Sequence, residues 1–363
     1  MNAQPTQPSE RATGRADAPD TRRQALALAT GMAAGALAVV LGLVAGAQGW
    51  EVGLLARWFG GSSAAASDAL SLTIVQDIRL PRSLGAWLVG ALLGLAGAIA
   101  QGLFRNPLAD PYLLGSASGA ALGVALAMVL GGLSGQVVLG AGLLLRWGLV
   151  GAAFAGALLG VLFTLALARG VQQTLRLLLA GVIVGVVLSA AREVLALQQP
   201  DILPVMQSFM LGQAAYLGWP SVRVLAWALG VALVGALALA RVLDGLALGE
   251  DTARSLGLPL GPLRLALIAV MALATGAAVA QTGLIAFVGL AAPHLVRSVV
   301  RTTHARLVGL SALAGGVLLL AADLQARSWI APQELPVGVL TAVLGGGYLL
   351  WLMHRGRGAK GAV

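Results

Sequence analysis

The stretch Ser83-Leu-Gly-Ala-Trp-Leu-Val-Gly-Ala-Leu-Leu-Gly-Leu-Ala-Gly-Ala-Ile-Ala-Gln-Gly-Leu-Phe104 contains no charged residue. An apolar run of about 20 residues is long enough to cross the hydrocarbon layer of a bilayer as one α-helix. Lipid offers the backbone no hydrogen-bonding partner, so a single crossing segment must satisfy its own amide groups as a helix. The stretch therefore predicts a transmembrane helix over 83–104, and the same pattern recurs along the chain.

Hydrophobic residues make up 58% of the 363-residue chain and charged residues only 10%, whereas about a quarter of a soluble domain is charged. Mean hydropathy is +0.89. This composition predicts an all-α integral membrane protein, with a disordered cytoplasmic tail at 1–23 and one membrane domain at 24–363. About ten spans are expected, near 24–48, 83–104, 112–133, 147–168, 176–195, 222–241, 264–281, 284–300, 307–326 and 336–353.

An even number of spans places both termini on the same side of the membrane. Both ends are basic, with Arg22 and Arg23 before the first span and Arg355 and Arg357 after the last. Cytoplasmic loops carry the excess of Lys and Arg in membrane proteins, so both termini are predicted to be cytoplasmic. Glycines four residues apart, such as Gly90 and Gly94, predict closely packed helix pairs.

Composition also excludes several functions for this chain alone. It has no cysteine, which excludes disulfides and thiol chemistry, and its three histidines all fall on the predicted cytoplasmic side. We therefore expect no metal site, and a substrate that contains metal should arrive already chelated. The net charge is +9, but the basic residues lie between the apolar spans and form no dense patch. No nucleic-acid partner is therefore expected.

The chain has one lysine and no phosphate-binding loop of the Gly-x-x-x-x-Gly-Lys-Ser/Thr type. It therefore hydrolyses no nucleotide, and the energy for its activity must come from outside this chain. The spans carry almost no titratable residues, which disfavours a stand-alone secondary carrier or channel coupled to ions. That class stays open as the alternative. An intramembrane enzyme is less favoured, since the spans offer no paired carboxylates and no Ser/Lys or Ser/His pair.

Three polar stretches interrupt the apolar pattern at defined places. Arg79-Leu-Pro-Arg82 lies at the predicted outer mouth of the second span, and an inner turn containing Asn106, Pro107, Asp110 and Pro111 follows that span. The longest inner loop carries the third stretch, Gly249 to Gly257, which is short, amphipathic and suited to dock in a groove on a partner.

Together with three later stretches, these motifs resemble the FecCD family of ABC-transporter permeases, the membrane subunits of importers for iron-siderophore, haem and cobalamin. The resemblance covers about residues 70 to 355 and rests on six stretches in order. They are Arg79-Leu-Pro-Arg82, Gln101-Gly-Leu-Phe-Arg-Asn-Pro-Leu-Ala-Asp-Pro111, Gly249-Glu-Asp-Thr-Ala-Arg-Ser-Leu-Gly257, Gly283-Leu-Ile-Ala-Phe-Val-Gly-Leu-Ala-Ala-Pro-His294, Ala322-Asp-Leu-Gln-Ala-Arg327 and Glu334-Leu-Pro-Val-Gly338.

The resemblance implies a type II ABC importer permease fold with ten spans in the inner membrane, working as a homodimer around a central pathway. Two separate ATPase subunits would bind ATP and Mg, so this chain would be non-catalytic and hold no cofactor. A periplasmic binding protein would dock on Arg79, Arg82 and Arg327. The ATPase coupling loop would comprise Gly249, Glu250, Asp251, Thr252, Ala253, Arg254, Ser255, Leu256 and Gly257.

The family's inner gate corresponds here to the turn that contains Gln172, Gln173 and Thr174. No motif in the sequence separates the family's substrates. Iron-siderophore and cobalamin are comparably favoured and haem follows closely, with a lean to iron chelates because most family members handle them.

Overall fold

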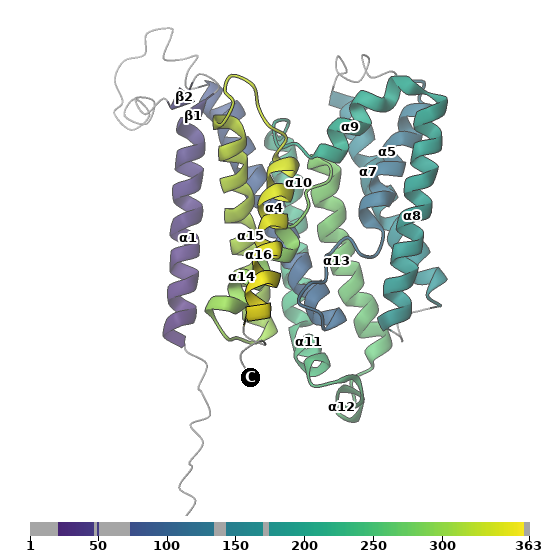
Figure 1. The fold of residues 1–363 in the computed structure, drawn as a ribbon, viewed down its shortest axis with the longest axis vertical. Coiled ribbons are helices and arrows are strands. Elements are labelled where there is room, and N and C mark those ends of the chain that lie inside the picture. The colour runs from purple at the N-terminus through teal and green to yellow at the C-terminus, as the bar shows by residue number, and fades with distance from the viewer. Residues whose placement is uncertain (1–20, 47–48, 51–72, 134–142, 170–173, 359–363) are drawn as a thin grey trace, which may run out of the picture.

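The computed structural model describes residues 21–46, 49–50, 73–133, 143–169 and 174–358. Within these ranges the chain forms a bundle of long helices with one two-residue strand pair, in which Ala45 pairs with Trp50 and Gly46 with Gly49 (Figure 1). The elements are α1 (Thr21–Val44), β1 (Ala45–Gly46), β2 (Gly49–Trp50), the π-helical turn η1 (Val75–Arg79), α4 (Leu80–Phe104), α5 (Ser116–Leu130), α7 (Leu143–Leu167), α8 (Thr174–Gln198), the 3₁₀ turn η2 (Pro200–Ile202), α9 (Leu203–Leu211), α10 (Trp219–Ala238), α11 (Ala240–Ala247), α12 (Glu250–Ser255), α13 (Leu260–Thr282), α14 (Val288–Val299), α15 (His304–Ser328) and α16 (Val337–Gly358).

Seven helices in the described ranges are long and apolar enough to cross a membrane: α1, α4 with η1, α7, α8, α10, α13 and α15. Two shorter apolar helices lie at 116–130 and 337–351. Each of these nine covers most of one predicted span. The predicted tail at 1–23 falls largely outside the described residues, and α1 already begins at Thr21.

The predicted span at 284–300 does not form as a full span. Residues 283–287 are not helical, and α14 begins only at Val288 and ends at Val299. The break has a backbone cause, because Phe287 at the start of α14 has a left-handed φ of 67° and Gly283 a φ of 71°. At 1.5 Å per residue α14 is about 18 Å long, well short of a hydrocarbon layer of about 30 Å.

The first turn of α1, helix α12 and the last turn of α16 lie at one end of the bundle, which we call the α12 end (Figure 1). The strand pair and α9 lie at the opposite end, the hairpin end. Both described ends of the chain therefore lie at the α12 end of the bundle.

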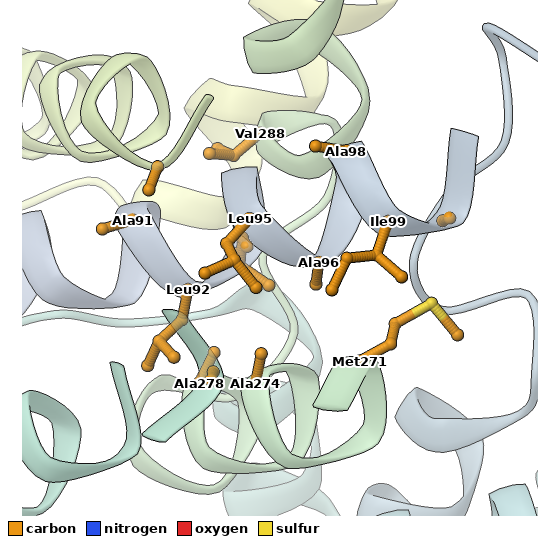
Figure 2. Packing of buried hydrophobic residues seen from close by; sticks show 14 of the residues in the cluster. Ala91, Leu92, Leu95, Ala96, Ala98, Ile99, Met271, Ala274, Ala278 and Val288 are labelled. Atoms are coloured by element: carbon orange, nitrogen blue, oxygen red, sulfur yellow. The ribbon is translucent and has the colours of Figure 1, made fainter. Parts of the chain in front are cut away.

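Helix α4 is the centre of the bundle, and every residue from Ala91 to Phe104 is buried. Its side chains Leu92 and Ile99 face Ala278 and Met271 of α13 (Figure 2). On another side, glycine lets α4 approach α15 closely, since a Cβ at Gly94 would lie 2.1 Å from the carbonyl oxygen of Ser311. The close helix packing predicted from glycine spacing is confirmed for this pair.

Candidate functional site

A cluster of charged side chains joins α4 to α15 near the hairpin end. It comprises Arg82, Asp323, Arg327 and Glu334, and we call it the Asp323 cluster. Arg82 donates from Nη2 to Asp323 Oδ1 at 2.9 Å and from Nη1 to Glu334 Oε1 at 2.8 Å. Arg327, one helical turn beyond Asp323, donates from Nε to Asp323 Oδ2 at 2.8 Å. Both oxygens of one carboxylate are therefore held by two guanidinium groups.

Burial decides what this cluster can do. The side chains of Asp323 and Arg327 are 1% and 4% exposed and that of Arg82 is 11% exposed, whereas Glu334 is 36% exposed. A buried charge is costly unless it is paired and hydrogen-bonded. In this conformation Arg82 and Arg327 stabilise the helix packing through Asp323, and Glu334 is the member of the cluster that faces outward.

The third arginine predicted for docking lies nearby but has different contacts. Arg79 ends the turn η1, is half-buried, and donates from Nη1 to the carbonyl oxygen of Leu43 at 3.0 Å, so it ties α4 to the end of α1. The structure thus brings Arg79, Arg82 and Arg327 to the same end of the bundle. Docking of a binding protein there stays a prediction.

A second charged cluster lies at the α12 end and centres on Glu250, the first residue of α12. Its Oε1 atom is 2.6 Å from Nη2 of Arg264, 3.2 Å from Nη2 of Arg105 and 3.2 Å from Oγ1 of Thr174. Its Oε2 atom is 3.5 Å from Nη2 of Arg254. We call these five residues the Glu250 cluster.

The charge of Glu250 is favoured by its surroundings. Burial by itself raises the pKa of the Glu250 carboxyl, but the hydrogen bond and positive charge of Arg264, with smaller contributions from Thr174 and Arg105, outweigh that effect. The pKa of Glu250 is therefore below its usual value and the group is ionised at neutral pH.

The predicted inner turn at 105–111 is held by its own side chains. Arg105 ends α4 in the left-handed region with a φ of 50°, and its amide donates to the carbonyl oxygens of Gln101 and Gly102. Asn106 Oδ1 accepts from the amide of Leu108 at 2.9 Å. Pro107 and Pro111 lie in this non-helical turn, where the missing amide donor costs nothing.

Asp110 completes the same turn by accepting from the amide of Tyr112 at 2.8 Å. Burial raises the pKa of the Asp110 carboxyl, and this hydrogen bond partly opposes the rise. The Tyr112 hydroxyl donates to the carbonyl oxygen of Ile285 at 3.2 Å, which links the turn to the non-helical segment before α14.

Of the three predicted gate residues, Gln172 and Gln173 lie outside the described residues. Thr174 is described as the first residue of α8, and its side chain belongs to the Glu250 cluster. The predicted coupling loop 249–257 forms the short helix α12, which begins after Gly249 and ends before Gly257. Within the described ranges no group of three or more His, Asp and Glu residues could hold a metal ion.

Sequence reasoning missed two polar pairs between distant segments. Asp244 of α11 accepts from both the amide and Nδ1 of His304, at 3.0 and 2.7 Å, and so caps the start of α15. Gln101 of α4 donates to the carbonyl oxygen of Leu290 at 3.1 Å and accepts from Arg297, so it joins α4 to α14. Gln101 is a lone polar residue in an apolar run, and this position was the sequence signal that could have indicated such a contact.

Comparisons with known proteins agree with this architecture. Residues 34–355 match the model of the FecCD transport family. The vitamin B12 import system permease protein BtuC of Escherichia coli O9:H4 is 41% identical over 284 residues, which is 78% of this chain and 84% of that protein. The protein of the same name from Salmonella typhi is 41% identical over 280 residues, 77% of this chain and 83% of that protein.

Two solved structures are similar. One, described as an inward-facing conformation of a metal-chelate type ABC transporter, has a TM-score of 0.77 and 27% identity, covering 90% of this chain and 98% of its own. PsaBC from Streptococcus pneumoniae in complex with Fab has a TM-score of 0.54 at 16% identity, over 74% of this chain and 88% of its own, and shows likeness of fold alone.

The helical bundle, its membrane-crossing helices and these relatives define a multi-pass inner-membrane permease of the ABC importer type. The chain belongs to the FecCD transport family.

Proposed function

We propose that this chain is the membrane subunit of an ATP-driven importer whose first-choice substrate is cobalamin. The observation that supports cobalamin as the substrate is the 41% identity to vitamin B12 permeases over 78% of the chain. It moves the preference from iron chelates to cobalamin, while ferric siderophores and haem remain family-level alternatives. The substrate would move from periplasm to cytoplasm.

The proposal includes the assembly around the chain. Two copies would enclose the pathway, two ATPase subunits would bind ATP and Mg at the α12 end, and a periplasmic binding protein would dock at the hairpin end. This orientation puts the basic flanks of the chain in the cytoplasm. About ten membrane-embedded helices in the type II importer arrangement are proposed, with α14 as a partial span.

Helix α8 has an exposed apolar face, which supports contact with lipid or with a second copy of the chain. Val182, Ile183, Val186 and Val187 are between 54% and 65% exposed in the isolated chain. Contiguous apolar surface of this kind marks a lipid or protein contact. In the proposed assembly this face of α8 lines the contact between the two copies.

Uptake into proteoliposomes tests the function. We expect the chain with its ATPase subunits and binding protein to accumulate cobalamin only when ATP is supplied, because the predicted spans carry almost no titratable residues that could couple transport to an ion. Cobalamin uptake by the chain reconstituted alone would overturn the proposal and favour the alternative, a stand-alone secondary carrier or channel.

The docking part of the proposal is tested at Arg79. Charges at an interface rim mainly steer association, so R79E should slow association of the binding protein by about tenfold at low salt and by less at high salt. Surface plasmon resonance on the purified complex measures the rate. R79Q separates loss of the hydrogen bond to Leu43 from charge repulsion.

The matched control is R223E, an exposed arginine near the start of α10. An equal loss of rate in R223E, or none in R79E, contradicts docking at Arg79. Arg82 and Arg327 are unsuitable for reversal, since a carboxylate at either position would face the buried Asp323.

A further inference from the structure

Glu250 joins four segments of the chain that are far apart in the sequence. Its own helix α12 is the predicted site of ATPase contact, Arg264 lies on α13, Arg105 lies in the α4–α5 turn, and Thr174 begins α8. The donors from the other three segments converge on one oxygen, Oε1. Loss of that single atom's charge weakens all three connections together.

Helix α12 has few other attachments among the described residues. Helix α12 packs against α11 through its own residue Ala253, which is fully buried. Its residues Asp251, Thr252 and Arg254 are exposed. It is flanked by Gly249 and Gly257, whose φ angles of 109° and 77° are strained for any residue with a Cβ. Helix α12 is therefore bounded on each side by a turn that favours glycine.

Arg264, the partner nearest to Glu250, is better anchored than α12 itself, whereas the side chain of Arg105 is 41% exposed. The Arg264 side chain is 3% exposed within α13, and Arg105 caps the buried helix α4. Thr174 lies at the first turn of α8, so a displacement of Glu250 pulls directly on the start of that helix. An ionised carboxylate with three donors at 2.6 to 3.2 Å makes this connection strong and directional.

We propose that Glu250 is the positioning residue that makes α12 move together with the start of α8 and the α4–α5 turn when the ATPase subunits close. The inference rests on the proposed ATP-driven function. Glu250 itself touches neither substrate nor nucleotide. Its role is to convert a push on α12 into movement at the α12 end of the pathway.

The experiment uses the full complex in proteoliposomes and compares wild type with E250Q, which preserves size and removes charge. We expect cobalamin transported per ATP hydrolysed to fall on the order of tenfold in E250Q, in the usual range for loss of coupling between sites. The matched control D201N removes an exposed carboxylate in η2 and should match wild type in transport per ATP.

A distance measurement separates coupling from mere stabilisation. The chain has no cysteine, so S255C and R176C, both at exposed positions, place spin labels only on α12 and α8. With Glu250 present, ATP should leave the distance between these labels nearly constant because the segments move together. In E250Q the same distance should shift and broaden when ATP is added.

The proposal is overturned if E250Q and wild type agree in either readout. If E250Q fails to assemble, T174V removes a single donor and should give the same two changes to a smaller extent, and agreement of T174V with wild type then overturns it. Failure of the wild-type complex to transport cobalamin, ferric siderophore or haem with ATP would instead count against the proposed function.

Discussion

Replacing Asp323 with alanine should lower the free energy of unfolding by about 3 to 5 kcal/mol, the usual cost of removing one partner from a buried ion pair. The carboxylate holds both Arg82 and Arg327, and the latter is 4% exposed. Without Asp323, the hydrogen bonds that Arg327 retains among the described residues are the long ones to Ser83 and the carbonyl oxygen of Gly42, at 3.5 and 3.4 Å. Denaturation in mixed micelles measures the change.

Two comparisons show whether burial of unpaired charge is the cause. D201A removes an exposed carboxylate and should change stability by no more than about 0.5 kcal/mol. The combined variant R82M/D323L/R327M removes the charges together and should recover most of the loss, because an apolar replacement of a buried ion pair is often neutral. A loss below about 1 kcal/mol in D323A would show that the Asp323 cluster does not hold α4 to α15.

The second large effect is expected from Gly97 to alanine, on the face of α4 that meets α14. A Cβ at Gly97 would lie 1.6 Å from the carbonyl oxygen of Gly289, a backbone atom that cannot turn aside. The two helices must separate, which also strains the hydrogen bond from Gln101 to Leu290. We expect a loss of about 1 to 3 kcal/mol or more, measured by the same denaturation.

Gly148 provides the matched control for this glycine. It also lies within a helix, α7, but a Cβ there would meet no atom within 4 Å. G148A should therefore leave stability unchanged or raise it by about 0.5 to 1 kcal/mol, since alanine restricts the unfolded chain. Equal effects of G97A and G148A would contradict a close approach of α4 to α14.

The long apolar helices could be predicted from the sequence because a bilayer demands uninterrupted apolar runs. The predicted span 83–104 became α4 at Leu80–Phe104, which starts earlier because Pro81 is tolerated in a first helical turn. The span predicted at 284–300 begins four residues before the helix α14 does, because hydropathy does not report backbone torsion. The left-handed Phe287 interrupts a run that is mostly apolar.

The charged clusters could be predicted only in part. Asp323 and Arg327 are four residues apart on one helix, so their pairing was readable from spacing. Their partner Arg82 lies 241 residues from Asp323, and no local pattern reports such a contact. The resemblance placed Glu250 in a coupling loop, but its contacts to Arg264, Arg105 and Thr174 depend on how the helices assemble.

ATPase activity of the complete complex, measured with and without loaded binding protein, tests the central claim most directly. The complex would contain this chain, its ATPase subunits and its binding protein, and each of cobalamin, a ferric siderophore and haem would be tried. The account predicts that cobalamin raises ATP hydrolysis. An intact complex whose ATP hydrolysis responds to none of the three would contradict it.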